Sequence, residues 1–177
     1  MKSVFKLKLN GKACVFVDWA NVYGWRSSLK KGVDAKKLYK YLRSYKTIKD
    51  VNFYFGTDTN IKSKKFLTAV KRVGYTVCTK PVKYILVTTI EGQKVYRRKC
   101  DFDMEMCIDT HQALNEDFDS FIFFSGDGDF EPLYKLLLAN NKQVVVIFAD
   151  GHLGKEIALM RKVFKKAINK IDVDVFI

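Results

Sequence analysis

The chain has 177 residues, of which 48% are hydrophobic and only 10 are glycine and 2 proline, so it is neither disordered nor fibrous. Its 32 lysines and arginines against 19 aspartates and glutamates give a net charge of +13. Such an excess favours a polyanionic partner, nucleic acid or an acidic membrane surface, although a lysine-rich proteome alone would explain much of it. The length predicts one domain over residues 1–177, and no apolar run approaches the roughly 20 residues of a membrane span.

Strands and helices alternate along most of the chain. Apolar runs predict strands at 13–17, 51–55, 75–79, 121–124 and 144–148. Apolar spacing and capping residues predict helices at 34–45, 60–73, 103–115, 132–140 and 155–168. The first strand is apolar at every position, which is typical of a strand buried on both faces. We therefore expect an α/β fold, a Rossmann-like parallel sheet with helices on both faces.

One segment departs from this alternation. Residues 82–89 and 94–99 have strand character and are separated by Glu91-Gly92-Gln93, which is typical of a turn. We expect a β-hairpin insertion here, with a basic second strand. The four cysteines include no CxxC pair, and we expect free thiols in a reducing, cytoplasmic compartment.

Aspartates directly follow two of the predicted strands. Asp18 follows the first strand, and Asp127 and Asp129 follow the fourth. Ligands bind at the carboxyl ends of strands in open parallel sheets, and carboxylates gathered there repel one another unless a cation lies between them. Mg²⁺ or Mn²⁺, which prefer carboxylate and water oxygens, is the expected cation. For Asp129, capping of the following helix is an equally good explanation.

The glycines on either side of Asp127 support a ligand site, because Gly126 and Gly128 allow a sharp turn and the close approach of a ligand. A fourth carboxylate, Asp103, begins the helix at 103–115, where the helix dipole would also stabilise it. Asp109 is six residues further on, about 120° around the helix. If both act, one contacts the metal and the other supports it from the side.

Three sequence blocks, in this order, resemble the NYN domain family in its LabA-like group, within the PIN-like nuclease superfamily. They are Phe16 to Tyr23, a basic-then-acidic block at 99–114, and Ser125 to Leu133, and the match spans about residues 13–150. The family usually has glycine where Trp19 and Cys100 stand, whereas the acidic positions are intact.

The resemblance implies a PIN-like fold and metal-dependent endonucleolytic cleavage of RNA that leaves a 3′-hydroxyl and a 5′-phosphate. It implies that Asp18, Asp103, Asp127 and Asp129 are catalytic and hold one or two Mg²⁺ or Mn²⁺ ions, with Asp109 as a further outer ligand.

The expected partner is RNA, single-stranded in particular, and no membrane. The candidate substrate-binding residues are Trp19, Asn21, Ser125, Arg97, Arg98 and Lys99. The tryptophan offers a stacking surface for a base. The asparagine and serine could bond a phosphate oxygen or a metal-bound water, or instead orient their own turns. The three basic residues would guide the RNA strand toward the metals.

Two other interpretations stay open. A non-catalytic RNA-binding module would bind RNA tightly, give no product and be indifferent to chelators. A toxin or regulator that acts through a protein partner would use some of the 9 tyrosines and 14 phenylalanines at an interface, although most of these belong to the core. The sequence also leaves homo-oligomerisation open.

Overall fold

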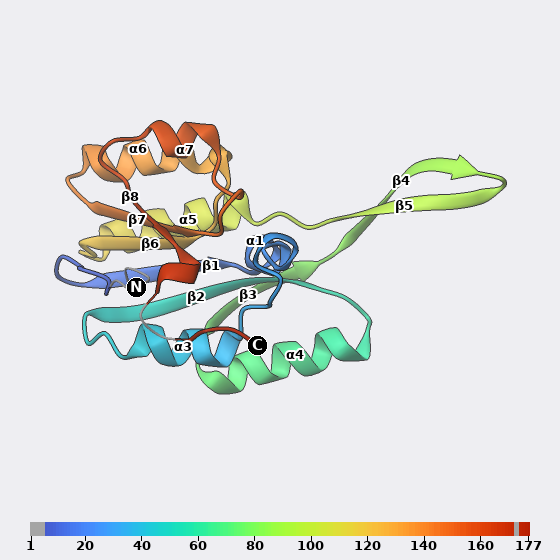
Figure 1. Ribbon diagram of the computed structural model, residues 1–177, viewed down its shortest axis with the longest axis horizontal. Helices are drawn as coiled ribbons and strands as arrows, with labels where there is room; N and C mark the ends of the chain where they lie inside the picture. Colours follow the sequence, from blue (N-terminus) through green and yellow to red (C-terminus); the bar gives the residue numbers. More distant parts are fainter. Residues whose placement is uncertain (1–5, 172–173) are drawn as a thin grey trace.

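The computed structural model describes residues 6–171 and 174–177, and a six-stranded parallel sheet forms its centre (Figure 1). The strands, in the order in which they lie side by side, are β3 (Thr76–Pro81), β2 (Ile48–Thr57), β1 (Ala13–Asp18), β6 (Ser120–Phe124), β7 (Gln143–Phe148) and β8 (Phe164–Ala167). The chain starts at the middle of the sheet, runs outward to β3, and returns to pair β6 with β1. The order reverses between β1 and β6, which is where ligands bind in doubly wound sheets.

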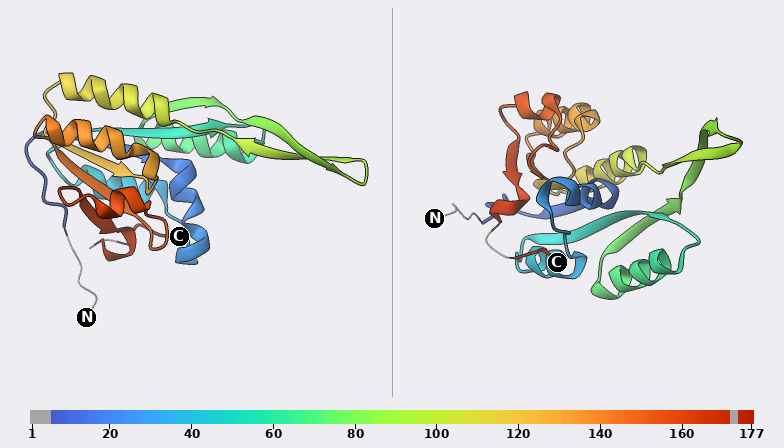
Figure 2. Two further views of the ribbon diagram at one scale, coloured as in Figure 1. Left: turned by 90° about the horizontal axis from the view of Figure 1, so that it is seen from above. Right: turned by 45° about the vertical axis from the view of Figure 1, so that its right-hand side comes forward.

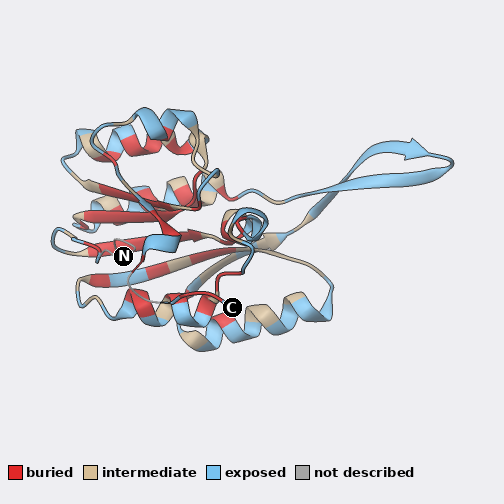
Figure 3. Ribbon diagram, viewed as in Figure 1, coloured by how far each residue is buried: buried red, intermediate tan, exposed pale blue. Residues whose placement is uncertain are grey.

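Helices cover both faces of this sheet, as predicted (Figure 2). One face carries α1 (Trp19–Gly24), α3 (Ala35–Arg43) and α4 (Ile61–Val73). Val15 and Val17 of β1 belong to the core between these helices and the sheet. The opposite face carries α5 (Asp103–Asn115), α6 (Glu131–Ala139) and α7 (Lys155–Leu159). Cys14 and Phe16 of β1 belong to the core on this face. Strand β1 is buried (Figure 3). Its alternate side chains enter the two different cores, so both of its faces are covered.

Side chains cap the amino ends of α3 and α4, and a glycine ends α4. The Asp34 carboxylate accepts from the backbone N–H groups of Lys36 and Lys37, and the Asn60 side chain accepts from that of Lys62. Gly74 ends α4 with a φ of 115°, a left-handed conformation that glycine adopts without strain.

The predicted helix at 155–168 is wrong. Helix α7 ends at Leu159, and Phe164–Ala167 forms the edge strand β8, which pairs parallel with β7. Lys165 of this strand donates to the backbone carbonyls of Ala158 and Met160, and so stabilises the end of α7. Two short helices directly after β1, α1 and α2 (Arg26–Leu29), were not predicted.

The hairpin insertion is confirmed. Strands β4 (Lys83–Ile90) and β5 (Gln93–Lys99) pair antiparallel, and Glu91 and Gly92 turn between them with φ angles of 48° and 80°. Every residue of the two strands is exposed, and the hairpin projects away from the sheet and its helices (Figures 1 and 3). We call residues 83–99 the arm.

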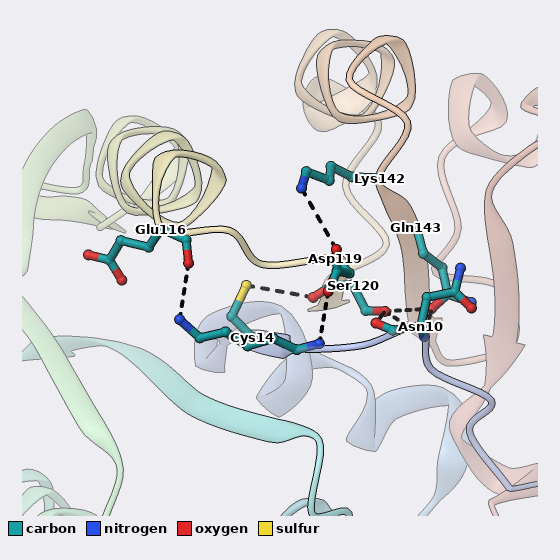
Figure 4. A network of polar contacts seen from close by, with 8 residues as sticks. Asn10, Cys14, Glu116, Asp119, Ser120, Lys142 and Gln143 are labelled. Atoms are coloured by element: carbon teal, nitrogen blue, oxygen red, sulfur yellow. Dashed lines mark hydrogen bonds and ion pairs between the residues drawn. The ribbon is translucent and has the colours of Figure 1, made fainter.

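Polar contacts tie together the amino ends of β1, β6 and β7 (Figure 4). The Ser120 hydroxyl lies 2.6 Å from the Asn10 carbonyl oxygen and 2.7 Å from Oε1 of Gln143. The Asp119 carboxylate accepts from the Lys12 backbone N–H at 3.0 Å, and its other oxygen lies 3.9 Å from Nζ of Lys142. At this end of the sheet, the polar and charged side chains form hydrogen bonds and ion pairs with neighbouring protein groups. The loops at the opposite end contain the predicted aspartates.

The four cysteines are free thiols. Within residues 6–171 and 174–177, no helix combines the length and apolarity needed to cross a membrane.

Candidate active site

Three of the predicted aspartates meet at the carboxyl ends of β1 and β6. Asp18 is the last residue of β1, and Asp127 follows β6, its neighbour in the sheet. Asp103 begins α5 and approaches from the arm. The pKa of Asp18 is raised to about 6, first by burial and then by the charges of Asp103 and Asp127. The three carboxylates therefore lie within electrostatic reach of one another.

The pKa of Asp103 is also raised, first by burial and then by the charge of Asp127, with further contributions from Asp101 and Asp129. Asp129 is exposed, but its effect on Asp103 places it at the rim of the same cluster. We refer to Asp18, Asp103, Asp127 and Asp129 as the acidic cluster.

The members of the acidic cluster lack ion-pair partners among the described residues. No lysine or arginine in the described part of the chain forms an ion pair with any of its members. Lys80, whose charge lowers the pKa of Asp103, donates to both carboxylate oxygens of Glu105 at 2.7 Å. In a chain of net charge +13, unpaired carboxylates are groups that could hold a cation.

A buried hydroxyl beneath the cluster also lacks a partner. Tyr134 of α6 is fully buried, and its OH has no hydrogen-bond partner among the described residues. Its pKa is raised by burial and then by the charges of Asp127 and Asp18. The sequence places this tyrosine on the apolar stripe of α6, with Phe130 and Leu137, so only the packing of α6 under the strand ends distinguishes it from a core residue.

These groups fit Mg²⁺ or Mn²⁺. Among the residues that the structure describes, no three histidine, cysteine, aspartate or glutamate side chains are arranged as a ready-made metal site. Mg²⁺ does not require one, because it keeps several waters and is commonly bound by one or two carboxylates together with substrate phosphates. The carboxylates without counter-charge and the unpartnered Tyr134 hydroxyl are the groups that would face a hydrated ion.

The two aspartates after β6 differ in role from the helix cap that the sequence suggested. Asp127 accepts from the Asp129 backbone N–H at 3.0 Å and starts a short 3₁₀ turn, Gly128–Phe130. Helix α6 then begins without a side-chain cap. The capping explanation for Asp129 is therefore wrong, and its carboxylate is left exposed beside the cluster.

Asp109 lies apart from the acidic cluster. It accepts a hydrogen bond of 2.7 Å from the hydroxyl of Tyr54, and its charge is not among those that raise the pKa of Asp18 or Asp103. The separation of about 120° around α5 explains this difference.

Asn21 and Ser125 orient the turns that hold the aspartates. The Asn21 side-chain oxygen accepts from Nε1 of Trp25 at 2.8 Å and from the backbone N–H of Gly126 at 3.4 Å. The buried Ser125 hydroxyl accepts from the Asp127 backbone N–H at 3.3 Å. These contacts join α1 to the loop after β6.

The glycines around Asp127 serve packing rather than a turn of special geometry. Neither Gly126 nor Gly128 has a positive φ. A Cβ on Gly126 would collide with the His152 carbonyl, and the Gly154 N–H donates to the Gly126 carbonyl at 2.7 Å. Gly126 therefore admits the 152–154 loop, and the close approach of a ligand at these glycines stays a prediction.

The Trp19 ring belongs to the core. It is 7% exposed and packs on the rings of Phe53 and Phe66, with centroid distances of 5.0 and 5.1 Å. It offers little surface on which a base could stack. Arg97, Arg98 and Lys99, by contrast, are exposed at the root of the arm, where the chain continues through residues 100–102 to Asp103.

Comparisons with known proteins agree with this architecture. The family model described as NYN domain matches residues 12–169. The chain is 28% identical over 148 residues to Low amplitude and bright protein LabA of Synechococcus elongatus, which covers 82% of this chain and 78% of LabA. The fold of this chain is similar to the crystal structure of a protein of unknown function from Vibrio parahaemolyticus, with a TM-score of 0.72 and 23% identity. The match covers 98% of this chain and 100% of that one. The chain therefore belongs to the NYN domain family.

Proposed function

We propose that this protein is a metal-dependent ribonuclease, an endonuclease that hydrolyses RNA phosphodiester bonds at the acidic cluster. The observation that carries the proposal is the meeting of Asp18, Asp103 and Asp127, without counter-charge, where the strand order reverses. Membership of the NYN domain family supports it, because this family is related to PIN-like nucleases.

Each part of the cluster has a role in this proposal. Asp18, Asp103 and Asp127 would hold Mg²⁺ or Mn²⁺, and the exposed Asp129 would bond its outer waters. A bound ion supplies Lewis acidity, which lowers the pKa of a coordinated water and stabilises charge on the scissile phosphate. Asn21 and Ser125 hold the two turns in register, and Asp109 supports α5 from the side through Tyr54.

The basic residues next to the cluster bring the substrate to it. Arg97, Arg98 and Lys99 lie on the strand that leads into Asp103, so they would bind phosphates of the approaching RNA strand. Because each neutralised phosphate releases counterions, binding should weaken with salt, by a log–log slope of about 0.7 for every phosphate contacted on a single strand.

The experiment is cleavage of end-labelled RNA by the purified protein in Mn²⁺ or Mg²⁺, with EDTA as one control and two variants as others. Asp127→Asn should lower the cleavage rate by at least about 100-fold, the loss typical when a group that stabilises developing charge is removed. RNA binding should stay close to that of the unsubstituted protein.

Asp50→Asn is the matched control, because it removes an exposed carboxylate at the opposite end of β2 and should cleave normally. Cleavage that persists in Asp127→Asn or in EDTA would contradict the proposal. RNA binding without product, unchanged by EDTA, would instead identify a non-catalytic RNA-binding module.

A further inference from the structure

The arm concentrates exposed apolar side chains. Seven of the fifteen large hydrophobic residues that are exposed in the described part of the chain lie on it. They are Tyr84, Ile85, Leu86, Val87, Ile90, Val95 and Tyr96. A two-stranded hairpin with both faces in water is only marginally stable, and a contiguous apolar surface of this kind marks a binding surface.

The charge of the arm indicates what it binds. Within residues 83–99, five cations outnumber a single carboxylate, that of Glu91. The cations are Lys83, Lys94, Arg97, Arg98 and Lys99. This excess opposes the pairing of two arms from different copies, because like charges would meet across the contact. It favours a polyanion.

The strand register sorts the arm into two unlike faces. Residues directly opposite each other in an antiparallel pair share a face, and Tyr84 pairs with Arg98 while Leu86 pairs with Tyr96. Beyond the bulge at Val87, Thr89 pairs with Lys94. We define the tyrosine face by the residues Tyr84, Leu86, Thr89, Lys94, Tyr96 and Arg98. The opposite face carries the aliphatic Ile85, Ile90 and Val95 together with the cations Lys83, Arg97 and Lys99, but no aromatic ring.

The tyrosine face combines exposed rings with cations. The residues Tyr84 and Tyr96 are 53% and 51% exposed, and they lie diagonally across the two strands. Arg98 lies opposite the first ring, and Lys94 comes two residues before the second ring on the same face of β5. Aromatic rings interleaved with cations are the usual platform for single-stranded nucleic acid, because every base can stack and every phosphate can pair.

The root of this face is anchored to the body. The Tyr84 hydroxyl donates to the Asp58 carboxylate at 2.6 Å, and the Arg98 guanidinium lies 3.3 Å from the same carboxylate. Strand β5 then runs through residues 100–102 into Asp103 of the acidic cluster. A strand of RNA held on the tyrosine face is thereby connected to the proposed catalytic end of the sheet.

We propose that the tyrosine face of the arm binds single-stranded RNA, with unpaired bases stacked on Tyr84 and Tyr96 and phosphates bound by Lys94 and Arg98. The proposal rests on the proposed function for the identity of the polymer. It adds that the bases must be unpaired, because the bases of a duplex are already stacked and do not present their faces.

The test measures binding in EDTA, by fluorescence anisotropy, of a labelled RNA strand and of the same strand annealed to its complement. Tyr96→Ile keeps an apolar, β-branched side chain but removes the ring, and it should weaken single-strand binding roughly 5- to 150-fold, the equivalent of one lost stacking partner. Duplex binding should change little. Lys94→Gln should instead reduce the salt slope by about 0.7.

Val95→Thr is the matched control, because it makes a neighbouring side chain on the opposite face polar with little change in shape. It should bind RNA normally. Unchanged binding by Tyr96→Ile, an equal loss for duplex RNA, or an equal loss in Val95→Thr would overturn the proposal. So would a dimer in sedimentation that dissociates in Val95→Thr or Tyr96→Ile, since the arm would then be an interface between copies.

Cleavage in Mn²⁺, measured on the same variants, separates this inference from the nuclease. If the protein cleaves RNA but Tyr96→Ile binds RNA as tightly as the unsubstituted protein, the proposed role of the arm is contradicted and the proposed nuclease activity is supported. If single-strand binding depends on Tyr96 but no metal yields a cleavage product, the proposed nuclease activity is contradicted and the proposed role of the arm is supported.

Discussion

The two ends of the parallel sheet use the same residue types in opposite ways. At the amino ends of β1, β6 and β7, Asp119 accepts from the Lys12 backbone N–H and forms an ion pair with Lys142, and Ser120 is enclosed by polar partners. At the carboxyl ends, Asp18 and Asp127 have no ion-pair partner among the described residues, and the charge of Asp127 raises the pKa of Asp18 and of Asp103. One end thus contributes stability, whereas the other carries unpaired carboxylates at the proposed cation site.

The largest difference between the two ends should appear in cleavage. Asp103→Asn removes a member of the acidic cluster and should lower the Mn²⁺-dependent rate by at least about 100-fold. Asp119→Ala removes a carboxylate from the other end and should leave the rate nearly unchanged, while it lowers the melting temperature. Equal losses of activity in both variants, measured well below their melting temperatures, would erase the distinction.

The loop after β6 qualifies the comparison, because part of the carboxyl end is packed tightly. Gly126→Ala places a methyl group against the His152 carbonyl and should lower the free energy of unfolding by about 3 kcal/mol. Urea denaturation measures this change. A loss below about 1 kcal/mol would mean that the 152–154 loop moves away easily and does not hold the site.

The polar network at the amino end should show a smaller loss. Ser120→Ala leaves the Asn10 backbone and the Gln143 side chain without their shared partner, and it should cost about 1–2 kcal/mol of unfolding free energy. Cleavage should be unaffected at temperatures where the variant is folded. An unchanged unfolding midpoint would indicate that water replaces the hydroxyl at no cost.

The last expected effect has the opposite sign. In EDTA at neutral pH, Asp18→Asn should raise the free energy of unfolding by about 1–2 kcal/mol, because an unpaired, partly buried charge is removed and the amide oxygen can still accept from Asn21. The pKa of Asp18 lies above its ordinary value, so the folded state loses stability as the pH rises from about 4 to about 6.

The gain from Asp18→Asn should therefore be present at pH 7 and vanish near pH 4, which thermal unfolding at the two values would measure. A variant less stable than the unsubstituted protein at pH 7 would show that the capping role of Asp18 outweighs its unpaired charge.

Several features of the site could be predicted because they depend on local patterns. An apolar strand followed within three residues by Asp18 or Asp127 predicts a carboxylate at the carboxyl edge of a parallel sheet, since parallel strands all end on the same side. Asp34 and Gly74 act within one helical turn of themselves, so their capping roles also follow from the sequence.

Other features could not be predicted, because their causes lie elsewhere in the chain. Residues 164–167 form a strand because β7 offers a free edge, and Gly126 is required by a loop that begins 26 residues later at His152. The Trp19 ring turns into the core because Phe53 and Phe66 receive it.

The sequence by itself determined the α/β alternation, the hairpin, and the candidate aspartates, because apolar periodicity and the type of residue at each strand end are properties of short segments. Only the tertiary structure decided which carboxylates meet. Asp103 joins Asp18 and Asp127 and Asp109 does not, Tyr134 lies beneath them without a partner, and the tyrosines of the arm share one exposed face. The physical reason is that burial, charge coupling and strand register arise between segments distant in the chain, so they exist only once these are packed together.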